Sequence, residues 1–143
     1  MFTQRAAQAY AQIGLETGVA AASPHRLVLM LYDGAIKAIG DAGAHLATGN
    51  IAGKGEAVSR AISIVEQGLK GSLDVPRGGA IAGQLADLYD YMSRRLLLAS
   101  MRNDTAGLAE VTGLLRELRD AWASIDQPSA AAPAPAQAGY ALA

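Results

Sequence analysis

The side chains best placed to do chemistry in this sequence are two histidines, His25 and His45, because there is no cysteine. The lack of cysteine excludes disulfides, thiolate nucleophiles and Cys-ligated metals. Ferritin-like metal sites in helical bundles use Glu-x-x-His pairs, and no glutamate here has a histidine three positions later. Neither histidine has a second ligand at helical spacing, so we expect both to be solvated or capping residues. The sequence therefore predicts no metal, no other cofactor and no catalytic centre.

A glycine-rich stretch over residues 49–55 has some likeness to a phosphate-binding P-loop. Its spacing is one residue short, and Gly55 stands where a Ser or Thr must bind Mg²⁺. No strand is predicted before it. We interpret the stretch as a flexible connection between helices.

Three tyrosines are candidates for recognition instead of catalysis. Tyr32 lies beside Asp33, while Tyr89 and Tyr91 flank Asp90. A tyrosine ring is apolar but its hydroxyl needs a partner, so such residues suit either the rim of a core or a binding surface. The sequence leaves both interpretations open for all three.

Composition indicates packed helices. Of the 143 residues, 51% are hydrophobic, mostly Ala and Leu, and 17% are charged. This favours a single all-α domain. The net charge is −1 with no cluster of Lys or Arg, so we do not expect nucleic acid as a partner. No segment approaches the roughly 18 apolar residues of a membrane span, and no signal peptide is recognisable. We expect a soluble cytosolic protein without membrane insertion.

Hydrophobic periodicity and capping signals predict four helices, over residues 24–48, 51–72, 80–101 and 105–125. Ser23 is expected to cap the first helix, with Pro24 at its first position. Residues 74–79 have the composition of a turn. The loops are short, so the predicted fold is an antiparallel four-helix bundle over residues 23–126.

The first and third helices carry more apolar surface than a four-helix core requires. In the first, residues 27–32 are all apolar or aromatic and point in every direction. In the third, the predicted core seam is Ile81, Leu85, Leu88, Met92 and Ala99, which leaves Tyr89, Tyr91, Leu96, Leu97 and Leu98 outside it. The large side chains expected in the core are Leu27, Leu31, Leu85, Leu88, Leu115, Leu118 and Trp122. The surplus surface suggests a neighbour that does not belong to this chain.

The two ends of the sequence differ from the predicted bundle. Residues 1–22 are predicted to form a mobile N-terminal arm whose contacts come from Phe2, Tyr10 and Ile13. Residues 127–143 are rich in Ala, Pro and Gln and are predicted to be a disordered tail, to which no function is assigned.

Short blocks of sequence in a fixed order carry a family resemblance. They are Ala22-Ser23-Pro24-His25-x-Leu27, Met30-Leu31-Tyr32-Asp33-Gly34-Ala35, Lys54-Gly55-Glu56-Ala57, Ile64, Gly78-Gly79-x-Ile81-Ala82, Leu88-Tyr89-Asp90-Tyr91-Met92-x-Arg94-Arg95-Leu96-Leu97, Arg102-Asn103-Asp104 and Ala121-Trp122. Together they strongly resemble FliS, the family of flagellar secretion chaperones for flagellin, from about Phe2 to Ile125.

The resemblance implies a cytosolic bundle without enzymatic activity. Such a protein binds the disordered C-terminal segment of flagellin, prevents its premature polymerisation and presents it to the flagellar type III export gate. In the family, aromatic residues of the arm affect cargo binding, and the arm can occupy part of the cargo surface. Carried over, these are Phe2, where relatives commonly have Tyr, and Tyr10. The candidates for flagellin binding or arm capping are Phe2, Tyr10, Ile13, Tyr32, Tyr89 and Tyr91.

The residues themselves are consistent with an amphipathic helix bound in an apolar groove. Two alternatives stay open at this point. One is a self-associating structural bundle whose surplus apolar surface forms a homodimer interface. The other is a regulatory adaptor of flagellar assembly that sequesters another small protein.

Overall fold

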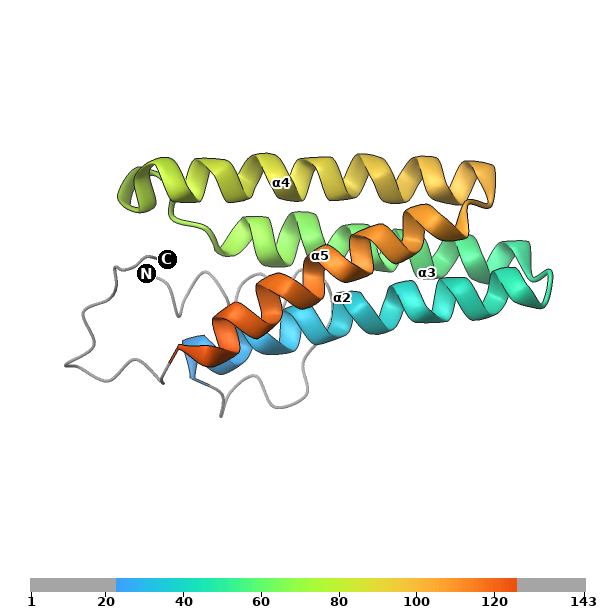
Figure 1. Ribbon diagram of the computed structural model, residues 1–143, viewed down its shortest axis with the longest axis horizontal. Coiled ribbons are helices and arrows are strands. Elements are labelled where there is room, and N and C mark those ends of the chain that lie inside the picture. The colour runs from blue at the N-terminus through green and yellow to red at the C-terminus, as the bar shows by residue number, and fades with distance from the viewer. Residues whose placement is uncertain (1–22, 126–143) are drawn as a thin grey trace.

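The computed structural model of the chain describes residues 23–125, which form an antiparallel bundle of helices (Figure 1). The predicted arm and tail lie outside these residues. The long helices are α2 (Pro24–Ala47), α3 (Ile51–Ser63), α4 (Val75–Arg102) and α5 (Thr105–Ser124). Two short segments, η1 (Ile64–Leu69) and η2 (Lys70–Ser72), continue α3. The predicted all-α, four-helix fold is confirmed for this part of the chain.

The beginning of α2 follows the predicted capping chemistry. The backbone N–H of Arg26 donates to Ser23 Oγ at 3.1 Å, and Pro24 occupies the first helical position. The next helix is capped in the same way, since the N–H of Gly53 donates to Asn50 Oδ1 at 2.9 Å. Local side-chain chemistry therefore sets both starts.

The second predicted helix, 51–72, is not uniform. After α3 the chain widens into a π-helix, η1, and then tightens into a 3-10 turn, η2. A Cβ added at Gly68 would lie 2.6 Å from Cδ2 of Leu31, so glycine lets α2 approach very closely. The hydroxyl of Ser72 donates to the Gly68 carbonyl at 2.6 Å and so satisfies a group that the irregular winding frees.

The third predicted helix begins earlier than expected. Residues from Val75 already form a helical turn, but Gly79 interrupts it with φ 63° and ψ −141°. This backbone conformation is open to glycine and strained for other residues. The regular part of α4 thus starts at Ala80, where the sequence predicted it. The turn predicted over residues 74–79 is present as an interruption of the helix at Gly79.

Leu27 and Leu31 of α2 and Leu115 of α5 are buried as expected, but the predicted seam of α4 is only partly correct, because Met92 and Ala99 alone of its five residues are buried. The buried side chains of α4 are Ala82, Tyr89, Met92, Leu96 and Ala99, whereas Ile81 is exposed and Leu85 and Leu88 are only half-buried. The reason is the path of α5. It lies beside α4 at the loop that joins them and then crosses obliquely towards the start of α2, away from the N-terminal half of α4 (Figure 1).

Candidate binding groove

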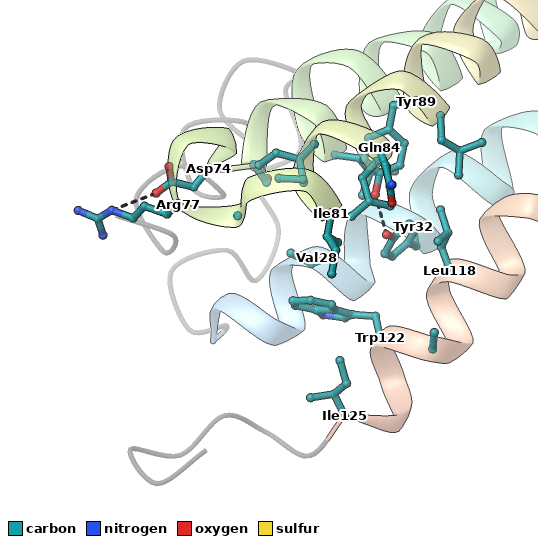
Figure 2. Close-up of a pocket in the computed structure, with 18 residues that line it drawn as sticks. Val28, Tyr32, Asp74, Arg77, Ile81, Gln84, Tyr89, Leu118, Trp122 and Ile125 are labelled. Atoms are coloured by element: carbon teal, nitrogen blue, oxygen red, sulfur yellow. Dashed lines mark hydrogen bonds and ion pairs between the residues drawn. The ribbon is translucent and has the colours of Figure 1, made fainter. Parts of the chain in front are cut away.

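An apolar groove lies where α4 and α5 diverge. It has a volume of about 620 Å³, and its walls come from α2, the segment Leu69–Asp74, α4 and α5 (Figure 2). Its apolar lining consists of Val28, Leu69, Leu73, Ile81, Ala82, Leu85, Leu88, Leu118, Ala121, Trp122 and Ile125. A concave apolar surface of this size is typical of a binding site.

Four residues expected in the core line this groove instead. Leu85, Leu88, Leu118 and Trp122 are each half-buried, because no helix of the described chain covers their outer side. Their apolar spacing is correct for a core, but a core needs a further neighbour at this end of the bundle. The groove walls are therefore made of residues with core-like patterns.

The floor of the groove holds a pair of tyrosines. The hydroxyls of Tyr32 and Tyr89 are 2.7 Å apart and share a hydrogen bond, and the residues are 4% and 2% exposed. Burial raises the pKa of Tyr32 to about 12, although the hydrogen bond from Tyr89 lowers it. Burial, followed by the nearby Tyr32, raises the pKa of Tyr89 well above its usual value. Both phenols are neutral, and their bond ties α2 to α4.

One wall of the groove is fixed by a reciprocal contact between the first turn of α2 and the last turn of α5. The His25 ring donates from Nε2 to the Trp122 carbonyl at 2.8 Å, and the Trp122 indole donates from Nε1 to the His25 carbonyl at 3.0 Å. The two rings stack with centroids 5.2 Å apart. His25 is thus a structural partner of the groove residue Trp122.

Polar groups lie at one end of the groove. Asp74 and Arg77 form an ion pair at 3.6 Å there (Figure 2). The Arg77 side chain is exposed, so this pair contributes little to stability. The pair does provide charges of both signs at the mouth of an otherwise apolar site.

The six residues predicted to form the binding surface are placed differently. Tyr32 and Tyr89 come together at the floor, whereas Tyr91 does not line the groove and its hydroxyl donates to Glu110 on α5. Hydrogen bonding to that carboxylate raises the pKa of Tyr91. Phe2, Tyr10 and Ile13 lie outside the described residues.

The walls that sequence reasoning missed are Ile81, Leu73 and Ile125. For Ile81 the available signal was the width of the apolar face on residues 80–101, which exceeds one core seam.

Two other kinds of feature are absent from residues 23–125. In this part of the chain, no three His, Cys, Asp or Glu residues are grouped so that they could hold a metal ion. Over the same residues, no helix has the length and apolarity needed to cross a membrane.

Comparison with known proteins shows the family to which the chain belongs. The model of the family described as flagellar protein FliS matches residues 6–129. The flagellar secretion chaperone FliS of Salmonella typhimurium is 49% identical over 125 residues, which cover 87% of this chain and 93% of that protein. The chain belongs to the FliS family.

More distant FliS proteins match over the same extent. The flagellar secretion chaperone of Escherichia coli K12 is 44% identical over 85% of this chain and 90% of its own length. That of Bacillus subtilis is 36% identical over 85% of this chain and 86% of its own. All groove residues, from Val28 to Ile125, fall inside the region that matches the FliS family model. Membership supports an export-chaperone role for this chain.

Proposed function

We propose that this chain is a cytosolic chaperone that binds the C-terminal segment of flagellin in the groove between α4 and α5. The bound segment is kept from polymerising and is delivered to the flagellar type III export gate, without catalysis. The observation that supports this most directly is the apolar groove of about 620 Å³, which no described part of the chain fills. The FliS-family relationship supplies the class of partner.

The proposed binding mode follows from the shape and chemistry of the groove. A disordered segment that folds on binding must recover its lost conformational entropy through buried apolar area. An amphipathic helix does this by inserting one apolar face between two receptor helices. Here that helix takes the place of the missing neighbour beside Leu85, Leu88 and Leu118.

The N-terminal arm is part of the same proposal. A groove this apolar is an aggregation hazard when empty. We expect the arm, through Phe2, Tyr10 and Ile13, to cover part of it until flagellin displaces the arm. Deletion of residues 1–16 should then change the affinity for flagellin or lower the solubility of the free protein. If neither changes, the arm has no such role.

Calorimetric titration tests the main proposal. The chain is titrated with a peptide of about 40 residues from the C-terminus of the flagellin of the same organism, and separately with an N-terminal peptide of equal length. We expect one-to-one binding of the C-terminal peptide alone, with a large negative heat-capacity change. Failure to bind either peptide would exclude the proposed activity.

A matched pair of variants locates the site. Ile81 lies in the groove and Leu97 lies on α4 outside it, and their exposed fractions are similar at 43% and 53%. Ile81→Asp should weaken the C-terminal peptide at least tenfold, because a carboxylate would be desolvated in the groove. Leu97→Asp should bind as the wild type does. Equal effects of the two substitutions would place the site elsewhere.

A second candidate function, self-association, is favoured by one observation. Leu97, Leu98 and Met101 form an exposed apolar row on the C-terminal half of α4, and Met101 is 71% exposed. If this row is a homodimer interface, sedimentation should show a dimer that Met101→Lys converts to a monomer. A monomeric wild type at high concentration would exclude this function.

A further inference from the structure

The apolar floor of the groove contains two hydroxyl groups whose hydrogen bonds are incompletely used. Tyr32 and Tyr89 each bring one hydroxyl hydrogen, and the 2.7 Å bond between them uses one of the two. Among residues 23–125, neither hydroxyl makes a second hydrogen bond. One hydrogen of the pair is therefore left without an acceptor in the described chain, and both tyrosines line the groove (Figure 2).

The other hydroxyl of the groove behaves differently. Ser72 also lines the groove, but its hydroxyl donates to the Gly68 carbonyl at 2.6 Å. Its hydrogen is used within the chain. The tyrosine pair is thus the one place on the buried lining, among the described residues, where a donor is left for a ligand.

We propose that the Tyr32–Tyr89 pair is a specificity determinant that recognises one neutral hydrogen-bond acceptor on the apolar face of the bound helix. This rests on the proposed function, because it describes the segment that the groove accepts. The acceptor is the side-chain oxygen of an Asn, Gln, Ser or Thr that replaces an apolar residue at one position of that face. A carboxylate does not fit, since one shared donor cannot compensate for the desolvation of a full charge.

The energetics make this a selective feature. In the empty groove, water can accept the spare hydrogen bond. When a wholly apolar helix displaces that water, the donor is left buried without a partner, at a cost equivalent to roughly 5- to 150-fold in affinity. A site built to make a hydrogen bond rejects ligands that lack the matching group more strongly than an apolar site rejects a ligand of the wrong size. The pair therefore discriminates against generic amphipathic helices.

The experiment is a double-mutant cycle between chaperone and peptide. The chaperones are the full-length wild type and the Tyr32→Phe/Tyr89→Phe variant. The peptides are the flagellin C-terminal segment of about 40 residues and a set in which each Asn, Gln, Ser or Thr is replaced singly by Leu or Val. We expect one position at which the apolar replacement weakens wild-type binding about tenfold but leaves binding to the double variant unchanged or stronger.

This loss or reversal of the preference for the polar side chain, which we call the reversal, separates recognition from a purely structural role. If the tyrosines only connect α2 to α4, the double variant weakens all peptides by the same factor. Replacement of both partners by phenylalanine keeps the shape of the floor and is close to neutral for folding. Thermal unfolding of each variant confirms that the bundle is intact.

Tyr91→Phe is the matched control, because Tyr91 lies on the same helix with its hydroxyl bonded to Glu110, outside the groove. It should reproduce the wild-type preference at every position. If the parent peptide binds but no position shows the reversal, the inference is wrong while the proposed function stands. If the parent peptide does not bind the wild type, the proposed function itself fails.

Discussion

The two ends of the bundle are built in opposite ways. At one end, the α4–α5 loop meets the start of α3 and polar groups close the structure. The ammonium of Lys54, a residue only 7% exposed, donates to the Ser100 carbonyl at 2.7 Å and to Asn103 Oδ1 at 2.6 Å. Arg95 bridges Glu110 at 2.8 Å and Asp104 at 3.3 Å. Directional bonds therefore hold three helices together there.

At the other end, α4 and α5 separate (Figure 1). Apolar side chains line the groove there. Two polar contacts of buried side chains at this open end are the His25–Trp122 clamp and the Tyr32–Tyr89 bond, and both link α2 to another helix. Neither joins α4 to α5. The comparison shows how one bundle can combine a fixed end with an end that accepts an additional helix, and it predicts that the two ends respond to different perturbations.

The largest expected effect is alkaline destabilisation of the open end. Burial raises the pKa of Tyr32 from 10.0 to about 12, so the folded state retains a proton that the unfolded chain loses. This stability is fully present below pH 10 and is lost as the pH rises towards 12, by about 3 kcal/mol. Urea unfolding across this pH range should show the loss, and Tyr32→Phe should remove that part of it. Equal pH dependence in both proteins would contradict the burial argument.

The closed end is tested by removal of its buried ammonium group. Lys54→Met leaves the Ser100 carbonyl and the Asn103 amide oxygen without their charged donor, and should lower the free energy of unfolding by about 2 kcal/mol. Lys37→Met is the control, since Lys37 is exposed and pairs only with Asp41, and should change stability by less than about 0.5 kcal/mol. The groove lies at the far end, so the affinity of folded Lys54→Met for the flagellin peptide should be unchanged.

The sequence predicts features that depend on neighbours along the chain. The Ser23 cap, the break near Gly79 and the four-helix count follow from such local signals. Features set by contacts between helices were not predictable in the same way. The N-terminal part of the α4 seam was wrong because spacing alone cannot show that α5 turns away and leaves Ile81 exposed. Likewise, no local pattern shows that Leu31 of α2 packs against Gly68 of η1.

The same distinction applies to the candidate site. Tyr32 and Tyr89 were recognised as residues with an apolar ring and a polar end, but nothing in the sequence pairs two hydroxyls that are 57 residues apart. Tyr91 has the same local pattern and lies outside the groove, because two positions along a helix point in different directions. Residue type therefore identified the candidates, and only tertiary structure could separate them.

Close packing at the closed end gives a third, smaller effect. A Cβ added at Gly107 would lie 2.8 Å from the Ala99 side chain and 2.7 Å from Arg95 Nη1, so Gly107→Ala should cost about 1–2 kcal/mol of stability. Gly113, on the same helix, has open space around it, and Gly113→Ala should stabilise the bundle by up to about 1 kcal/mol. Chemical denaturation of both variants measures the contrast. A gain in both would mean that α4 and α5 are less tightly packed at their loop.

Loss of the His25–Trp122 clamp at the open end should cost less stability than the main changes above. His25→Phe keeps an aromatic ring against Trp122 but removes the donor to its carbonyl, which also accepts from the N–H of Ile125. We expect a loss of about 1 kcal/mol and a shift in tryptophan emission, which is informative because the chain has one tryptophan. His45→Gln is the control, because His45 contacts Asn50 and not Trp122. It should leave the emission unchanged. An unchanged emission spectrum in His25→Phe would mean that the clamp does not position the indole.

The smallest effect is acid loosening of the closed end, opposite in pH to the tyrosine effect. The backbone N–H of Gly107, followed by the Arg95 guanidinium, lowers the pKa of Asp104, and hydrogen bonds from Tyr91 and then Arg95 lower that of Glu110. Their stabilisation is present above the unfolded pKa values of 3.8 and 4.5 and is lost as the pH falls through the lower folded values. Glu110 is exposed and Asp104 is only half-buried, so the loss is local and small.

Hydrogen exchange separates this acid effect from general unfolding. Between about pH 6 and pH 3, amides from Asn103 to Leu108 should lose protection, after correction for intrinsic exchange rates, before those around Tyr32 do. Glu110→Gln retains an acceptor for Arg95 but removes the charge. It should remove the part of the pH dependence of protection that comes from titration of Glu110. Glu117→Gln, at an exposed position of the same helix, should leave the profile as it is. If the groove end opens first on acidification, the two ends do not differ in the way that we infer from their contacts.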